Sequence, residues 1–206
     1  MPRPLESKVS KSEVERLLLI HRDHSKPRTE NKKGFFIDRA TFNAFFHKSF
    51  CFTDTIISDR VFRVFDKDND GHISEMEWIR GMSIFLRGHL EEQVKFCFEV
   101  YDMNGDGYIS REEMFTLLKS SLVKGNQEED PDEGVKDLVE LVIKKLDFDH
   151  DSRISLNDFK TGIDKDPLMM ESLGPCLPSP ETMEEFSALI SDVPNDGGMF
   201  KGKMKR

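Results

Sequence analysis

The sequence has few features that mark exported or membrane proteins. Its 206 residues contain no apolar run near the roughly 20 residues that a membrane-spanning helix requires. No basic and then apolar signal segment stands at the start, so we expect an intracellular protein. The widely spaced Cys51, Cys97 and Cys176 include no CxxC pair, which favours free thiols over a disulfide framework. Residue 2 is proline rather than glycine, which excludes an N-terminal myristoyl group, and we expect no membrane anchor.

Catalytic and nucleic-acid-binding signatures are also missing. The sequence has no phosphate-binding loop, no zinc signature and no serine, histidine and aspartate arrangement whose spacing argues for catalysis. A net charge of −9 argues against general nucleic-acid binding. We therefore expect a protein that is not an enzyme and binds no nucleic acid.

Acidic residues gather instead in residues 66–77, which read Asp-Lys-Asp-Asn-Asp-Gly-His-Ile-Ser-Glu-Met-Glu. Carboxylates at positions one, three, five and twelve, with glycine at position six, have the spacing of an EF-hand calcium loop. The expected ligands are the side chains of Asp66, Asp68, Asp70 and Glu77 and the backbone carbonyl of His72. A polar turn between two helices is the alternative, but chance would meet only one or two of these requirements.

Two later segments repeat the pattern. The loop at 102–113 is complete, and its expected ligands are Asp102, Asn104, Asp106, Glu113 and the carbonyl of Tyr108. The loop at 147–158 offers Asp147, Asp149, Asp151, Asp158 and the carbonyl of Arg153. This third loop has two defects, because Ser152 replaces the glycine at position six and Asp158 replaces the glutamate at position twelve.

Both defects should weaken Ca²⁺ binding in the third loop. Asp158 is one methylene shorter than glutamate, so bidentate contact requires the following helix to move closer, which relatively favours the smaller Mg²⁺. Ser152 adds a left-handed backbone cost of about 1 kcal/mol. We expect two strong Ca²⁺ sites and a third that is weaker or prefers Mg²⁺.

A fourth copy precedes the other three and has lost its ligands. It begins at Glu30 and keeps Ile37 at position eight. Apolar residues flank the loops at helical spacing, including Phe62 and Phe65 before the first complete loop and Trp78, Met82 and Phe85 after it. The pattern predicts an all-α fold of four helix–loop–helix units in two lobes. We expect short antiparallel contacts of Ile37 with Ile73 and of Ile109 with Ile154.

The chain is divided by composition into four segments. These are a basic helical arm at 1–33, an N-terminal lobe at 34–90, a C-terminal lobe at 91–165 with an acidic insert at 125–134, and a proline-containing extension at 166–206. We expect the insert to be a solvated loop, with an acidic patch for a partner as the alternative.

More detailed expectations concern the two ends of the chain. In the arm we expect a helix at 10–22 that begins with a capping box of Ser12 and Glu15, and solvated side chains for His21 and His24. In the extension we expect residues 168–173 to cover the apolar residues around Met114 and a helix at 181–191 to pack on the C-terminal lobe.

With these residues in view, the chain resembles the neuronal-calcium-sensor-like EF-hand proteins, with their degenerate first hand. The most specific segments are Glu129-Asp-Pro-Asp-Glu-Gly and Leu173-Gly-Pro-Cys-Leu-Pro, and the resemblance spans roughly residues 50 to 180. It implies a cytoplasmic, cytoskeletal Ca²⁺ sensor of the ciliary or flagellar axoneme that regulates waveform. The implied partner is an outer-arm dynein chain or a docking-complex subunit, with tubulin as a further candidate. A calcium and magnesium buffer and a static subunit of an axonemal complex are the alternatives.

Overall fold

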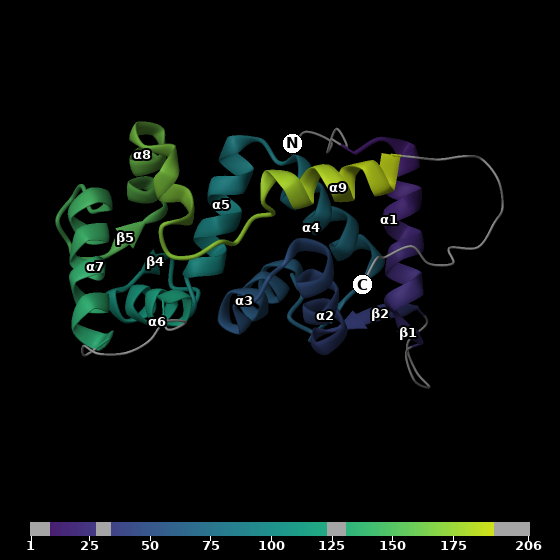
Figure 1. Ribbon diagram of the computed structural model, residues 1–206, viewed down its shortest axis with the longest axis horizontal. Coiled ribbons are helices and arrows are strands. Elements are labelled where there is room, and N and C mark those ends of the chain that lie inside the picture. The colour runs from purple at the N-terminus through teal and green to yellow at the C-terminus, as the bar shows by residue number, and fades with distance from the viewer. Residues whose placement is uncertain (1–8, 28–33, 123–130, 192–206) are drawn as a thin grey trace.

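Helices and very short strands alternate along the chain in the computed structural model, which describes residues 9–27, 34–122 and 131–191. The N-terminal half contains α1 (Lys11–His24), β1 (Lys26–Pro27), β2 (Phe35–Asp38), α2 (Arg39–Phe50), α3 (Thr55–Phe65), β3 (His72–Ile73) and α4 (Glu75–Arg87). The C-terminal half contains α5 (Leu90–Tyr101), β4 (Tyr108–Ile109), α6 (Arg111–Leu122), α7 (Pro131–Leu146), β5 (Ile154–Ser155) and α8 (Leu156–Lys165). A 3₁₀ helix, η1 (Pro167–Glu171), and α9 (Pro180–Ser191) follow. The predicted all-α fold is confirmed, and Figure 1 shows α5 on the side of the C-terminal half that faces α4.

The predicted loop pairings are confirmed. Ile37 of β2 lies opposite Ile73 of β3, and Ile109 of β4 lies opposite Ile154 of β5, both in antiparallel register. All four isoleucines are buried. The sequence did not predict β1, which adds to β2 as a third strand through the pair of Lys26 and Phe36.

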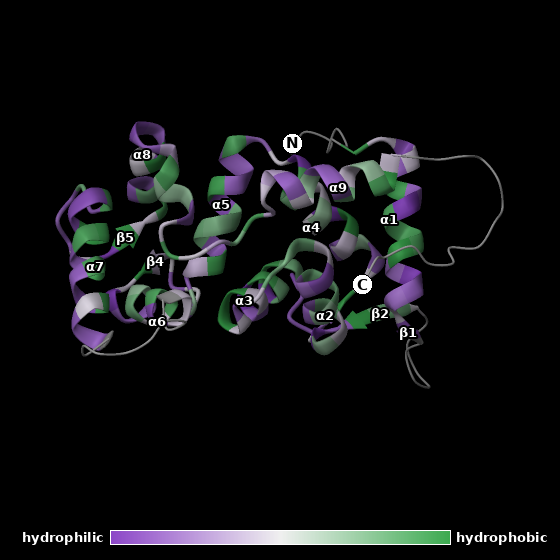
Figure 2. Ribbon diagram, viewed as in Figure 1, coloured by the Kyte–Doolittle hydropathy of each residue, from purple (hydrophilic) through white to green (hydrophobic). Residues whose placement is uncertain are grey.

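The apolar faces predicted from the helical spacing form the core. Aromatic residues dominate in the N-terminal half, where Phe42, Phe46, Phe65, Trp78 and Phe85 are all fully buried. Phe42 stacks on Phe46 with ring centroids 4.1 Å apart, and Phe46 contacts Phe85 at 5.1 Å. Figure 2 shows hydrophobic and hydrophilic residues on different sides of the helices, as amphipathic packing requires.

Helix α1 differs in detail from the sequence prediction and packs against α4. Its cap lies two residues before the predicted one, because Ser10 and Glu13 form the capping box instead of Ser12 and Glu15. The prediction that His21 is solvated is wrong, since its ring is fully buried and its Nε2 lies 3.0 Å from the carbonyl oxygen of Ile73. His24 is exposed, as predicted.

The C-terminal extension crosses from one half of the molecule to the other. Leu173 and Cys176 are buried, whereas η1 contacts α5 and α8 and leaves Leu168 83% exposed, so residues 168–173 form only part of the predicted cover. Helix α9 packs on α1 and α2, so the prediction that it packs on the C-terminal lobe is wrong (Figure 1). Pro175 and Pro178 prevent a continuous helix between η1 and α9, and Pro180 is the first residue of α9.

Parts of several predictions lie outside the described residues. These are the start of the degenerate loop at 30–33, the first part of the acidic insert at 125–130, and the chain ends at 1–8 and 192–206. The last part of the insert is not a loop, because α7 begins at Pro131 and carries Asp132 and Glu133 in its first turn. Proline at the first helical position and acidic residues near the helix N-terminus both favour this start. No helix of the described residues is long and apolar enough to cross a membrane.

Candidate functional site: three EF-hand loops

The loop at 66–77 folds around the carboxylate of Asp66. Asn69 and Gly71 have left-handed backbones, with φ of 56° and 79°, and turn the chain back toward the end of α3. The Asp66 carboxylate then accepts hydrogen bonds from the N–H groups of Asp70 and Gly71 at 3.1 and 2.8 Å. Carboxylate oxygens of Asp66, Asp68 and Asp70 lie within 4.8 Å of one another, close enough to share one metal ion.

Crowding of carboxylates makes this loop suited to a cation. Burial raises the pKa of Asp66, and the nearby charges of Glu77 and Asp70 raise it further. A bound divalent cation would relieve both effects, because it replaces lost hydration and neutralises the mutual repulsion of the carboxylates. Oxygen ligands at this density suit Ca²⁺ or Mg²⁺ rather than a softer metal.

Glu77 joins the loop to the helix that follows. One carboxylate oxygen accepts hydrogen bonds from the backbone and hydroxyl of Ser74 at 2.9 and 2.7 Å, which caps the start of α4. The other oxygen accepts from the N–H groups of Lys67 and Asp68 at 2.9 and 3.3 Å, at the start of the loop. The expected position-twelve ligand therefore already spans both ends of the loop. Ser74 thereby holds the Glu77 carboxylate in place.

The loop at 102–113 repeats this geometry. Glu113 accepts hydrogen bonds from the N–H groups of Met103 and Asn104 at 2.7 and 3.0 Å with one oxygen and from Ser110 with the other. Asp102 accepts from the N–H groups of Gly105 and Gly107. The side-chain carbonyl of Asn104 accepts from the N–H of Asp106 at 2.9 Å, so this oxygen faces the loop interior.

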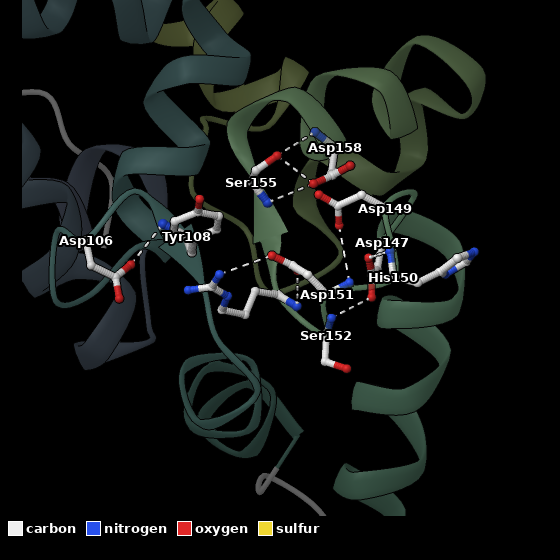
Figure 3. A network of polar contacts seen from close by, with 10 residues as sticks. Asp106, Tyr108, Asp147, Asp149, His150, Asp151, Ser152, Ser155 and Asp158 are labelled. Carbon is white, nitrogen blue, oxygen red and sulfur yellow. Dashed lines mark hydrogen bonds and ion pairs between the residues drawn. The ribbon is translucent and has the colours of Figure 1, made fainter.

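The loop at 147–158 brings its three aspartates together but strains its backbone (Figure 3). Carboxylate oxygens of Asp147, Asp149 and Asp151 lie within 4.8 Å of one another. His150 and Ser152 both have left-handed backbones, with φ of 63° and 68°. The left-handed backbone expected at Ser152 is observed, and Gly71 and Gly107 occupy the same conformation in the other two loops, where glycine has no side chain to oppose it.

The shorter side chain of Asp158 keeps its contacts local. It accepts hydrogen bonds from the backbone and hydroxyl of Ser155 at 3.2 and 2.5 Å, as Figure 3 shows. Within the described part of the chain, Asp158 accepts no hydrogen bond from Phe148 or Asp149, the counterparts of the residues that Glu77 and Glu113 reach. The third loop thus lacks the link between its start and its exit helix.

Arg153 supplies a positive charge inside the third loop that the sequence analysis missed. Its guanidinium lies 3.2 Å from the Asp151 carboxylate and 4.0 Å from the centre of the Tyr108 ring in the neighbouring loop. The sequence analysis had considered only the carbonyl of Arg153. A basic residue two places after an expected ligand was the available signal, since the Asp151 carboxylate is within reach of its side chain.

A second residue missed by sequence reasoning connects the two complete loops. Arg60, on α3, is 8% exposed and donates hydrogen bonds to four backbone carbonyls, those of Glu99, Val100, Asp102 and Met103. These carbonyls lie at the end of α5 and the start of the 102–113 loop. The sequence shows only a basic residue in an amphipathic helix, so no signal pointed to this contact.

Comparisons with known proteins agree with this description. Residues 91–163 match the family of EF-hand domain pairs, and residues 58–85 match the EF hand domain. The chain is 54% identical over 160 residues to calaxin of Homo sapiens, covering 78% of this chain and 76% of that protein. It is 53% identical over 189 residues to calaxin of Xenopus laevis, covering 91% and 90%. It is 28% identical over 181 residues to guanylyl cyclase-activating protein 1 of Lithobates pipiens, covering 86% and 82%.

Proposed function

Because the chain belongs to the calaxin family of EF-hand proteins, we propose that it is a calcium sensor that regulates outer-arm dynein in cilia and flagella. The sensing loops are those at 66–77 and 102–113, whose position-twelve glutamates each span a loop. The loop at 147–158 serves as a weaker site with a relative preference for Mg²⁺. The support for this ranking is the local bonding of Asp158, the strained backbone at Ser152 and the charge of Arg153 beside Asp151.

One observation carries the sensor proposal, namely the hydrogen bond from Trp78 to α1. Trp78 follows Glu77 directly, is fully buried, and donates from its indole Nε1 to the carbonyl oxygen of Leu17 at 2.9 Å. Any shift of Glu77 toward a bound ion therefore moves a side chain that holds α1. An EF-hand sensor couples ion binding to helix movement in this way, whereas a buffer loop leaves its helices in place.

Helix α9 is the element that would respond. It packs on α1 and α2, and Phe186 contacts Phe45 and Phe50 at ring-centroid distances of 6.1 and 4.9 Å. Phe186 and Ile190 are buried there, so α9 occupies an apolar surface of the N-terminal lobe. Moving α1 would loosen α9 and make this surface available to an amphipathic helix of a partner. The apolar surface that α9 covers thus belongs to α1 and α2 and not to the helix that carries Met114.

A hydrophobic dye tests the opening. Ca²⁺ should raise dye fluorescence in the wild-type protein, and Glu77→Gln should remove most of the rise because the loop loses its position-twelve carboxylate. Glu112→Gln is the control, since it makes the same change at an exposed glutamate in position eleven of the 102–113 loop, outside the ligand positions. A flat dye signal through Ca²⁺ saturation would instead favour the buffer or the static subunit.

The partner is tested separately by affinity capture from ciliary extract. A dynein chain or docking-complex subunit should be retained in Ca²⁺ and lost with the Glu77→Gln, Glu113→Gln double variant. By linkage, a partner that prefers the open protein must tighten Ca²⁺ binding by the factor by which Ca²⁺ tightens the partner. Equal capture with and without Ca²⁺ would identify a static subunit. Capture of tubulin alone would point to the microtubule as the binding surface.

A further inference from the structure

Two cysteines far apart in the sequence meet in the interior of the C-terminal half. Cys97 lies on α5 and Cys176 lies in the segment between η1 and α9. Both side chains are fully buried, and their Sγ atoms are 3.0 Å apart. Cys51 is exposed and lines the same pocket as Pro175 and Leu177, the neighbours of Cys176. The calcium-binding loops do not use either buried thiol.

The surrounding contacts hold the two thiols in this position. The Tyr101 hydroxyl, one helical turn after Cys97, donates a hydrogen bond to the carbonyl oxygen of Gly174 at 2.6 Å and lies 3.4 Å from the Cys176 sulfur. The backbone N–H groups of Cys176 and Leu177 both donate to the Glu171 carboxylate at 3.0 Å. The turn that carries Cys176 is therefore fixed at both sides of the residue, directly over α5.

This geometry needs little adjustment to become a covalent link. A disulfide joins its sulfur atoms at about 2.05 Å, so the two thiols must approach by only about 1 Å. We propose that Cys97 and Cys176 form a reversible redox pair whose disulfide fastens the C-terminal extension to α5. The oxidant is a peroxide, with hydrogen peroxide as the simplest case.

The reaction proceeds in two balanced steps. The Cys176 thiolate attacks hydrogen peroxide, the O–O bond breaks, and with one proton the products are a sulfenic acid and water. The Cys97 sulfur then attacks the Cys176 sulfur, the S–O bond breaks, and the hydroxyl leaves as water with the Cys97 proton. In total, two thiols and one peroxide give one disulfide and two waters, and a dithiol reductant reverses the change.

The order of the two steps follows from the positions of the sulfurs. Burial raises the pKa of the Cys97 thiol well above its usual range, and the neighbouring Cys176 thiol raises it further. The Cys97 thiol is therefore the poorer nucleophile and lies within α5, whereas Cys176 lies between Pro175 and Leu177, which both line a pocket. Cys176 is the residue that meets peroxide, and Cys97 is the one that resolves the sulfenic acid.

The link would act on the element that the proposed function uses. Residue 176 is four residues before the start of α9. A disulfide at this position would tie the chain just before α9 to α5. The expected effect of this link rests on the proposed function. The oxidised protein should release α9 less readily and show a smaller Ca²⁺-induced rise in dye fluorescence. Formation of the disulfide itself does not depend on that function.

The test uses the full chain carrying Cys51→Ser, which removes the exposed thiol. After hydrogen peroxide treatment, the protein is unfolded in denaturant and its remaining thiols are alkylated. Intact mass should fall by about 2 Da with no alkyl groups added, and peptide mapping should join residues 97 and 176. A dithiol reductant should restore two alkylatable thiols. Adding Cys97→Ser or Cys176→Ser must abolish the bridge, and thermal unfolding shows whether each variant is folded.

Two results would overturn the redox pair. One is full alkylation of both thiols after a peroxide dose that oxidises Cys51 in the wild-type chain. The other is oxidation of Cys176 to sulfinic acid without any linked peptide. If the bridge forms but the dye response is unchanged in the oxidised protein, the redox pair stands and the role of α9 in the proposed function fails.

Discussion

The guanidinium of Arg60 donates a hydrogen bond at 2.5 Å to the backbone carbonyl of Asp102, the first expected ligand of the second complete loop. Arg60 stands six residues before Asp66, the first expected ligand of the other complete loop. A second contact runs in parallel, since Lys67 forms an ion pair with Glu99 at 2.6 Å. The entering helix of one loop, α3, thus holds the entering helix of the next, α5.

We predict that replacing Arg60 uncouples the two loops. In the wild-type protein, Glu77→Gln should weaken Ca²⁺ binding at 102–113, and in an Arg60→Gln background this indirect effect should shrink toward zero. Calorimetric titration of the four proteins of this double-mutant cycle measures the coupling. Arg60→Gln should also lower the free energy of unfolding by about 3 kcal/mol, because buried carbonyls lose a charged donor. Arg63→Gln, at an exposed position of the same helix, should neither remove the indirect effect nor lower the free energy of unfolding. An unchanged indirect effect would show that the loops bind independently.

The third loop provides a prediction about the length of the side chain at position twelve, Asp158. Asp158→Glu adds the methylene that lets a carboxylate contact the start of the loop, as Glu77 does with Lys67 and Asp68. Calorimetry of the wild type should show two stronger sites and one weaker site. In the variant, Ca²⁺ affinity of the weaker site should rise by about tenfold, and its relative preference for Mg²⁺ should fall. Three equal sites in the wild type would contradict the ranking, and no gain in the variant would mean that α8 moves inward to compensate.

Arg153 provides a second, independent route to a tighter third site. Its ion pair with Asp151 must be given up when that carboxylate binds a cation. Arg153→Gln should therefore raise Ca²⁺ affinity of this site by about threefold, a modest factor because both side chains are partly exposed and water screens the pair. Arg111→Gln, which removes an exposed arginine paired with Glu140 on α7, is the control. Weaker binding in Arg153→Gln would show instead that stacking on Tyr108 shapes the loop.

The sequence repeat predicted the contacts that occur in each helix–loop–helix unit. It could not predict contacts that occur only once. The pairs Ile37–Ile73 and Ile109–Ile154 follow from position eight of a repeated unit, and the left-handed Ser152 follows from position six. No repeat constrains α9, whose apolar face fits any apolar surface, so its location on α1 and α2 could not be predicted. Arg60 and His21 are buried polar residues whose partners are backbone carbonyls distant in sequence, and a pattern of side-chain types carries no record of such partners.

His21 gives the folded protein a predictable dependence on pH. Its ring is buried, Nε2 contacts the carbonyl oxygen of Ile73, and Nδ1 is buried with no hydrogen-bond partner in the described structure. Burial lowers the pKa of His21 below its ordinary value of 6.5. The folded state thus holds the ring neutral at pH values where the unfolded chain would protonate it.

The sign of the effect follows from proton uptake on unfolding. Below about pH 6.5 the unfolded state binds a proton at His21 that the folded state does not, so the free energy of unfolding falls as pH decreases through this range. Above pH 6.5 both states are neutral and this contribution is constant. Chemical unfolding from pH 7.5 to 5.5 should show the decline in wild type and a smaller decline in His21→Gln, with His24→Gln, an exposed position, like wild type. Equal slopes in wild type and His21→Gln would mean that the ring protonates without leaving its site, and that the contact with Ile73 tolerates the charge.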